Sequence, residues 1–129
     1  MGTFRVTIEL GDPAGRRWEA LEALVDTGAT YATFPAALLR GLGVRPHAPG
    51  VFILADGRRV EREIGRTMIR VDGQEDMVPV VFGDAEATPL LGAVTLEILR
   101  LGVDPVSRRL IPVPGLLMGE GVLAEGPGS

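Results

Sequence analysis

Ala23-Leu24-Val25-Asp26-Thr27-Gly28-Ala29-Thr30 is the stretch of this sequence that decides its fold and its candidate chemistry. It places one carboxylate directly after a short apolar run, followed by a hydroxyl, a glycine and two small residues. An acid held at the end of a rigid apolar element is poorly solvated, which favours a catalytic carboxylate over a solvated surface charge. The alternative is a structural aspartate that caps backbone N–H groups in a strand-to-loop turn. The run occurs once, so a second carboxylate would have to come from a second copy of the chain.

Length and composition predict one β-rich domain. The chain has 129 residues, of which 46% are hydrophobic, and a mean hydropathy of +0.24, so it can bury a core of its own. The 18 glycines and 10 prolines are spread between short apolar runs, which is typical of strands joined by many turns. From about Gly119 the composition turns to Gly, Glu, Pro and Ser. We therefore predict a domain over residues 1–118 and a flexible tail over residues 119–129.

Charge and residue usage argue against several classes of function. The net charge of −4 gives no basic field to draw in nucleic acid. The sequence has no cysteine, which excludes disulfides, thiolate nucleophiles and zinc–thiolate sites. The first residues lack a signal-peptide pattern, and no stretch approaches the ~20 apolar residues that span a bilayer. We expect a cytoplasmic protein that binds neither nucleic acid nor membrane.

Alternation of apolar and polar residues predicts the first strand, and the turn after it favours a second. Residues 4–10 alternate with period 2, as a strand with one buried face does. A turn cluster at residues 11–15 leads into a second segment, from about Arg17 to Val25. That segment would also suit a helix, because it contains Ala, Leu and Glu. It is short and follows a hairpin turn, so a strand is favoured.

Two Asp-Gly pairs predict hairpins in the middle of the chain. Asp56-Gly57 lies between extended segments at residues 51–54 and 60–64. Asp72-Gly73 lies between residues 67–71 and 77–82 in the same way. Turn formation explains both aspartates, so neither is expected to be catalytic. A last strand is predicted at residues 110–113.

Helical signals are confined to two places. Residues 35–40 begin with proline and are followed by glycine, which predicts a helix of one or two turns. Residues 93–101 carry Val94, Ile98 and Leu101 at helical spacing before Gly102, which predicts the one substantial helix. The predicted fold class is mostly β, with one α-helix on the C-terminal side.

Several of these features together resemble the retropepsin-type, single-domain aspartic proteases, over about residues 3–113. The N-terminal hairpin leads into the run around Asp26, and a second hairpin follows in mid-chain. A strand at residues 80–83 then precedes Leu90-Leu91-Gly92 and the late helix, about sixty residues after the Asp-Thr-Gly motif. The motif alone is weak evidence, but this order of features strengthens the resemblance.

The resemblance implies a closed β-barrel lobe that acts as a homodimer, with one Asp26 from each subunit at the two-fold axis. It implies a catalytic loop of Asp26, Thr27 and Gly28, and a flap hairpin over about residues 52–62 that closes over a polypeptide substrate. No metal or cofactor is implied. The remaining site residues that it implies are Ala29, Thr30, Leu54, Ala55, Asp56 and Gly57 for substrate binding and Leu90, Leu91 and Gly92 for support of the catalytic loop.

The sequence departs from the retroviral pattern at two places. Thr30 and Ala93 stand where those enzymes usually have an acid and an arginine, so both halves of an ion pair are missing together. This double loss leaves no unpaired charge and indicates a cellular-type relative. The flap tip is also polar, with Asp56-Gly57-Arg58-Arg59 in place of a glycine-rich apolar turn.

The main functional hypothesis is an aspartic endopeptidase. A non-catalytic module that binds extended peptides with the same fold is the alternative, since the ion pair and the apolar flap tip are missing. An oligomerisation or scaffold domain is a third reading. The cluster of Arg58, Arg59, Arg62 and Arg66 is expected to be a solvated hairpin face, and selection of acidic substrates is its functional alternative.

Overall fold

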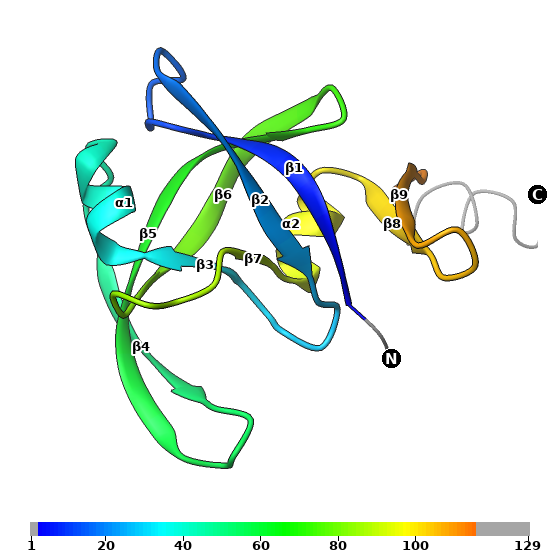
Figure 1. Cartoon of the computed structure of the whole chain (residues 1–129). Helices are drawn as coiled ribbons and strands as arrows, with labels where there is room; N and C mark the ends of the chain where they lie inside the picture. The colour runs from blue at the N-terminus through cyan, green and yellow to red at the C-terminus, as the bar shows by residue number, and fades with distance from the viewer. Residues whose placement is uncertain (1–2, 116–129) are drawn as a thin grey trace, which may run out of the picture.

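A computed structural model describes residues 3–115 of the chain (Figure 1). Within these residues the chain is mostly β, with nine strands and two helices of six residues each. In chain order they are β1 (Phe4–Gly11), β2 (Trp18–Val25), β3 (Ala32–Pro35), α1 (Ala36–Gly41), β4 (Ala48–Ile53), β5 (Arg59–Val71), β6 (Gln74–Gly83), β7 (Leu90–Leu91), α2 (Ala93–Ile98), β8 (Leu101–Asp104) and β9 (Arg109–Pro112).

Seven strands form one sheet in the order β1-β2-β7-β3-β6-β5-β4. The hairpins β1–β2, β4–β5 and β5–β6 are antiparallel, whereas β2–β7 and β3–β6 are parallel. β1 also pairs with β5, through Glu9↔Arg70 and Leu10↔Ile69. The first strand of this order is therefore also paired with the sixth. β7 is inserted between β2 and β3, and this brings residues 90–91 beside the end of the second strand.

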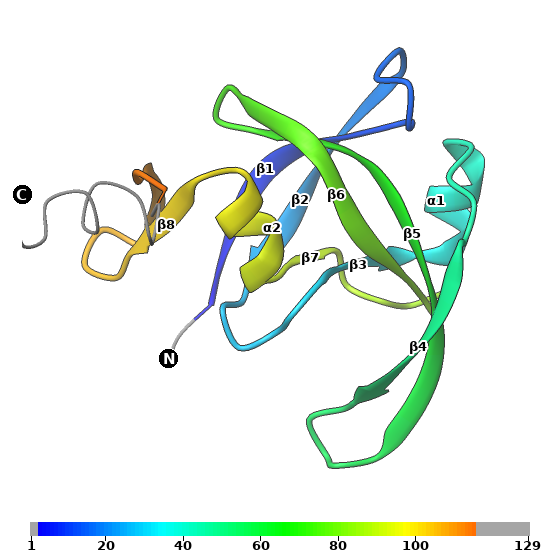
Figure 2. The same ribbon diagram turned by 180° about the vertical axis from the view of Figure 1, so that it is seen from behind.

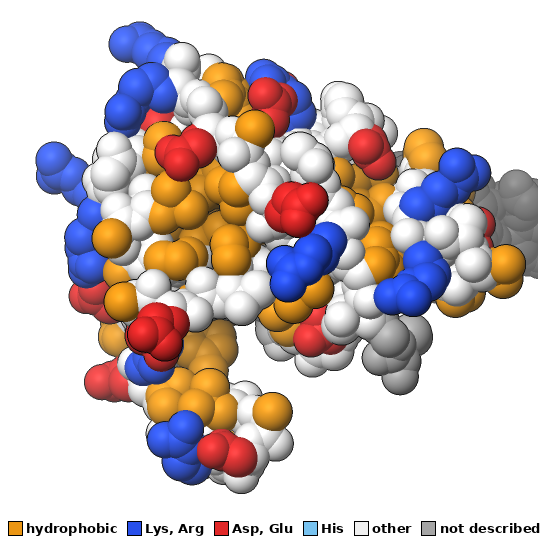
Figure 3. Space-filling model, in the orientation of Figure 1, with side chains coloured by type: hydrophobic (Ala, Val, Ile, Leu, Met, Phe, Trp, Pro, Cys, Tyr) orange, Lys and Arg blue, Asp and Glu red, His pale blue; other side chains and the backbone are white. Residues whose placement is uncertain are grey.

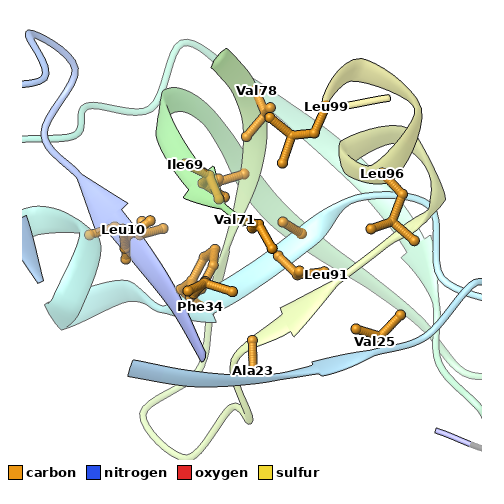
Figure 4. Close-up of a cluster of buried hydrophobic side chains, with 14 of the residues drawn as sticks. Leu10, Ala23, Val25, Phe34, Ile69, Val71, Val78, Leu91, Leu96 and Leu99 are labelled. Atoms are coloured by element: carbon orange, nitrogen blue, oxygen red, sulfur yellow. The ribbon is translucent and has the colours of Figure 1, made fainter. Parts of the chain in front are cut away.

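The core lies where the sheet curves around its apolar side chains (Figure 4). Ile8 and Leu10 of β1 and Ala23 and Val25 of β2 are buried, as the predicted period-2 pattern requires. Leu96 of α2 and Leu99, which directly follows the helix, belong to the same cluster. Other fully buried side chains of the cluster come from β3, β5, β6 and β7 and include Phe34, Ile69, Val71, Val78, Val80 and Leu91.

The predicted hairpins and both helical segments are confirmed. The segment before Asp26 is a strand, as favoured, because its side chains alternate against β1 along the whole register from Phe4↔Val25 to Gly11↔Trp18. Both Asp-Gly pairs lie in turns between paired strands. At the second turn Asp72 and Gly73 have φ of 50° and 81°, the left-handed values that a tight hairpin turn requires.

Two expectations about the elements were wrong, and two short strands were not predicted. The late helix ends at Ile98, because Arg100 adopts φ of 56° and Leu101 begins β8. α1 is as long as α2, so the chain has two short helices in place of one substantial helix. Strands β3 and β8 had no clear sequence signal, since each is only four residues long.

The last two strands of the described residues are not part of the large sheet. The β8–β9 hairpin forms a separate two-stranded sheet beyond α2, on the opposite side of the molecule from α1 (Figures 1 and 2). Asp104 accepts hydrogen bonds from the N–H groups of Val106 and Ser107 and so forms the turn of this hairpin. The predicted boundary between residues 118 and 119 lies outside the described residues. None of the described helices has both the length and the hydropathy to cross a membrane.

Candidate active site

Asp26 lies one residue beyond the end of β2 and is half-buried. Its backbone N–H donates to the carbonyl oxygen of Leu91 at 3.0 Å, and its own carbonyl oxygen accepts from the N–H of Ala29 at 3.1 Å. Its carboxylate Oδ1 accepts a hydrogen bond from the N–H of Gly28 at 2.9 Å. The backbone and one carboxylate oxygen of Asp26 are therefore both fixed.

The turn after Asp26 is tight because a small residue stands at Gly28. A Cβ atom at that position would lie 3.2 Å from Oδ1 of Asp26, closer than an ordinary contact. Thr27 and Gly28 are exposed, so this part of the turn faces outward from the lobe. The loop over residues 26–31, called the Asp26 loop below, thus presents its carboxylate at the surface on a constrained backbone.

Leu90-Leu91-Gly92 lies directly behind the Asp26 loop. Leu90 and Leu91 pair with Leu24 and Val25 of β2 in parallel register. A Cβ atom on Gly92 would lie 2.7 Å from the carbonyl oxygen of Thr30, so only glycine allows this close approach of two backbones.

The start of α2 completes the contact with the Asp26 loop. The N–H groups of Ala93 and Val94 donate to the carbonyl oxygens of Ala29 and Thr30, at 2.8 and 3.0 Å. These two N–H groups belong to the first turn of the helix, which has no intrahelical acceptors for them. The loop carbonyls satisfy them, so the start of α2 is hydrogen-bonded directly to the backbone of the Asp26 loop.

A groove of about 660 Å³ runs beside the Asp26 loop. One part of its lining comes from residues 28–31 and 33, and another from residues 51–55, 60 and 62 of the β4–β5 hairpin. The rest comes from residues 81, 83, 87, 88 and 90, in β6, β7 and the loop between them. Most of these side chains are apolar or small, so the groove can hold an extended chain with apolar side chains.

The β4–β5 hairpin projects from the body of the molecule (Figure 1), and its residues line one side of the groove. Hydrophobic side chains lie along the hairpin and charged side chains at its tip (Figure 3). Phe52 contacts Tyr31 of the Asp26 loop edge to face, with ring centroids 6.1 Å apart. The hairpin and the loop are therefore in contact across the groove.

The hairpin turn is held by Asp56. Its Oδ1 accepts from the N–H of Arg58 at 3.0 Å, and its Oδ2 from Nε of Arg58 at 2.8 Å. The backbone hydrogen bond first, and the side-chain hydrogen bond second, hold the pKa of Asp56 below its ordinary value. Gly57 has φ of 88°, which explains the glycine at this position.

Six of the twelve predicted site residues line the groove and six do not, and Asp26 and Thr27 are among those that lie beside it. Gly28, Ala29, Thr30, Leu54, Ala55 and Leu90 line the groove. Leu91 is fully buried and supports the loop through its carbonyl oxygen. Asp56 and Gly57 lie in the hairpin turn and are not among the residues that line the groove.

Several groove residues were not among the predicted ones, and they include Tyr31, Thr33, Val60, Arg62 and Val81. Thr33 lies on β3, which had no clear signal in the sequence. For Val60 and Arg62, the period-2 pattern of the strand was the available signal, because both lie on the face that carries Ile64. Within residues 3–115, no group of three or more His, Asp or Glu side chains is placed to hold a metal ion.

Comparisons with known proteins agree with this geometry. The sequence profile of a family described as aspartyl protease matches residues 6–95. A search of curated proteins found no match. The fold is similar to the solution structure of simian foamy virus (mac) protease, with a TM-score of 0.53 and 21% sequence identity. This similarity covers 74% of the present chain and 94% of the viral chain, and it shows that the fold is retropepsin-like.

Proposed function

The chain belongs to the aspartyl protease family, and on this premise we propose that it is an aspartic endopeptidase that works as a homodimer. Each subunit contributes one Asp26 to a pair of carboxyl groups that activates a water molecule. The observation that carries the proposal is the fixed Asp26 loop, in which Oδ1 of Asp26 accepts the Gly28 N–H beside an apolar groove. Positioning of a carboxylate at the end of a strand suits a group that must act on a bound substrate.

The proposed reaction needs the pair to share one proton, because two carboxylates a few Å apart do not both ionise. The ionised carboxylate accepts a proton from the water as the water oxygen attacks the peptide carbonyl carbon. The protonated carboxyl group donates its proton to the carbonyl oxygen, which gives a tetrahedral diol. Transfer of a proton to the amide nitrogen and cleavage of the C–N bond then release an acid and an amine.

Dimer formation is supported by strand edges that have no partner within residues 3–115. In β1, only Glu9 and Leu10 pair with β5, so its earlier residues keep one free edge. The β8–β9 hairpin has no pairing with the large sheet. In our proposal these terminal strands pair across a two-fold axis, which is the usual symmetry of a dimer. The exposed Thr27 then faces its counterpart near the axis.

We also propose that each lobe is a closed or nearly closed barrel. The pairing of β1 with β5 supports this, because it links the first strand of the sheet order to the sixth. In a closed lobe, the strands on either side of β7 would keep the Asp26 loop packed against β7. The domain is proposed to extend to residue 118, before the predicted tail.

The decisive experiment compares the wild type with Asp26→Asn. Both proteins are incubated with a diverse peptide mixture from about pH 4 to 7, and new termini are identified by mass spectrometry. Asparagine keeps an oxygen that can accept the Gly28 N–H, so the variant is expected to fold. We expect its cleavage rate to fall by about a thousand-fold or more. Cleavage at the wild-type rate would contradict the proposal.

A second measurement tests the dimer. Sedimentation of the wild type and of Asp26→Asn is expected to give the same dimer, since the substitution leaves the terminal strands unchanged. A chain that stays monomeric at high concentration cannot form the pair of carboxylates, and this result would overturn the mechanism.

A peptide-binding module is the second candidate function. Strand β4 is at the edge of the sheet, and a free edge can accept an extended peptide as an added strand. In that case peptides bind with equal affinity to the wild type and to Asp26→Asn and are recovered intact. Titration calorimetry with recovery of the peptide separates this candidate from the endopeptidase.

A further inference from the structure

Arg62 is the one charged side chain among the described residues that line the groove. It lies on β5 between Val60 and Ile64, which are half-buried on the same face. The residues that alternate with them, Arg59, Glu61 and Glu63, are exposed on the opposite face. Strand alternation therefore turns Arg62 toward the groove, at a position where the pattern otherwise has apolar residues.

Across the hairpin, Arg62 pairs with Gly50. A glycine in this cross-strand position has no side chain that could cover the arginine or compete for its space. The adjacent pair on this face, Phe52 and Val60, is apolar. Arg62 thus lies about 7 Å along the strand from an apolar pair, a spacing of two residues in an extended chain.

Arg62 also borders a second, smaller depression with Arg40, Glu61 and Glu63, and its guanidinium keeps N–H donors that no side chain of the described residues occupies. Its Nη1 donates to the carbonyl oxygen of Glu61 at 3.0 Å, and within residues 3–115 it forms no salt bridge. Glu63 is already paired with Arg40 at 3.1 Å. An arginine has five N–H donors in a planar fork that fits a carboxylate with two parallel hydrogen bonds.

The other arginines of the cluster do not share this placement. Arg58 is paired with Asp56 in the hairpin turn. Arg59 and Arg66 are exposed, and neither lines the groove. These three arginines are solvated, as the sequence predicted for the cluster. Arg62 differs from them, because it is half-buried and lines the groove.

We propose that Arg62 determines substrate specificity by binding an Asp or Glu side chain of an extended peptide. The peptide carries apolar side chains next to the scissile bond and the acidic side chain further along the groove. This inference rests on the proposed function of the same groove. A charge-assisted, partly solvated pair is expected to change kcat/KM by about tenfold.

The test uses synthetic peptides that are cleaved by the wild type and that differ only by Glu or Gln at one position. Each position on either side of the scissile bond is tested in turn. We expect the wild type to prefer Glu about tenfold at one position. The preference should weaken with added salt, and it should disappear below about pH 4.3, where the glutamate is protonated.

Three variants assign the preference to Arg62. Arg62→Met is expected to bring the Glu/Gln ratio near one, and Arg62→Glu to shift the preference to a Lys or Arg peptide at the same position. The matched control is Arg59→Met, which removes an equal charge from the opposite face and should keep the wild-type ratio. The proposal is overturned by a wild type without acidic preference, or by Arg62→Met with an unchanged ratio.

Binding measurements keep this inference separate from the proposed catalysis. The same peptide pairs are titrated into Asp26→Asn, with and without Arg62→Met. A Glu preference in binding that depends on Arg62, without cleavage by the wild type, contradicts the endopeptidase and supports the role of Arg62. Cleavage by the wild type with a Glu/Gln ratio of one supports the endopeptidase and contradicts the role of Arg62.

Discussion

The Asp26 loop and the β4–β5 hairpin face the same groove, but the protein holds them in different ways. The loop is fixed from behind, where the N–H of Asp26 and those of Ala93 and Val94 connect it with residues 91–94. Among the described residues, the outer strand of the hairpin, β4, pairs with β5 alone and lies at the sheet edge, and Phe52 adds one aromatic contact with Tyr31 of the loop. The exposed fractions of Val51 and Ile53 in that strand are 58% and 66%.

This difference separates two tasks that a peptidase has to combine. Chemistry requires a carboxylate held in one position, because small displacements of a reacting group are costly. Binding of varied peptides requires a surface that can adjust, and an edge hairpin with few buried contacts opens at a low free-energy cost. The loop therefore carries the candidate chemistry, and the hairpin carries the candidate specificity.

The largest expected effect is on the free energy of unfolding. It is tested by one substitution at a buried residue behind the loop and one at an exposed residue of the hairpin. Leu91→Ala creates a cavity beside β2 and is expected to lower the free energy of unfolding by about 2–5 kcal/mol. Ile53→Ala removes an exposed side chain and should change it by less than about 0.5 kcal/mol, while KM rises because Ile53 lines the groove. Urea unfolding at one fixed protein concentration measures the free energy of unfolding of both variants.

Equal losses of stability in these two variants would break the distinction between the fixed loop and the adjustable hairpin. An unchanged KM in Ile53→Ala would remove this residue from the substrate-binding surface.

A smaller effect tests the close approach at Gly92. In Gly92→Ala, the new Cβ meets the backbone of Ala29 and Thr30, which is not free to move. We therefore expect the free energy of unfolding to fall by about 1–3 kcal/mol and cleavage to be slower. Gly41→Ala is the matched control, because a Cβ there contacts nothing within 4 Å. It lies in α1, where alanine in place of glycine is neutral or stabilises by up to about 1 kcal/mol.

Thermal unfolding and cleavage rates of the two glycine variants give the comparison. If Gly92→Ala unfolds and cleaves like Gly41→Ala, residues 90–92 do not support the loop.

The smallest effect concerns the pH dependence of the hairpin turn. The hydrogen bonds from Arg58 lower the pKa of Asp56 from its ordinary value of 3.8. A lowered folded-state pKa adds stability above the ordinary value, and this contribution is lost as the pH falls through the folded pKa. The amide resonance of Arg58 should therefore titrate with a midpoint below 3.8 in the wild type.

In Asp56→Asn this titration of the Arg58 amide should be absent, while the resonances of the Asp26 loop stay the same as in the wild type. A wild-type midpoint at or above 3.8 would contradict the hydrogen-bonded turn.

Local patterns were sufficient to predict much of this protein. Alternation predicted β1, the preceding turn and the short length of the segment favoured β2, and the Asp-Gly pairs predicted two hairpins, because these signals depend on neighbouring residues alone. The Asp-Thr-Gly and Leu-Leu-Gly motifs identified the aspartyl protease family.

Tertiary structure decided what depends on contacts between distant residues. β3 and β7 exist because each finds pairing partners far along the chain, and their four and two residues are too few to carry a period of their own. The requirement for glycine at position 92 arises from the backbone of Thr30, more than sixty residues earlier. Arg62 is a member of an arginine cluster in the sequence. Strand alternation places Arg62 on the face of Val60 and Ile64, but only the fold shows that this face borders a groove, because the groove forms between the hairpin and the distant Asp26 loop.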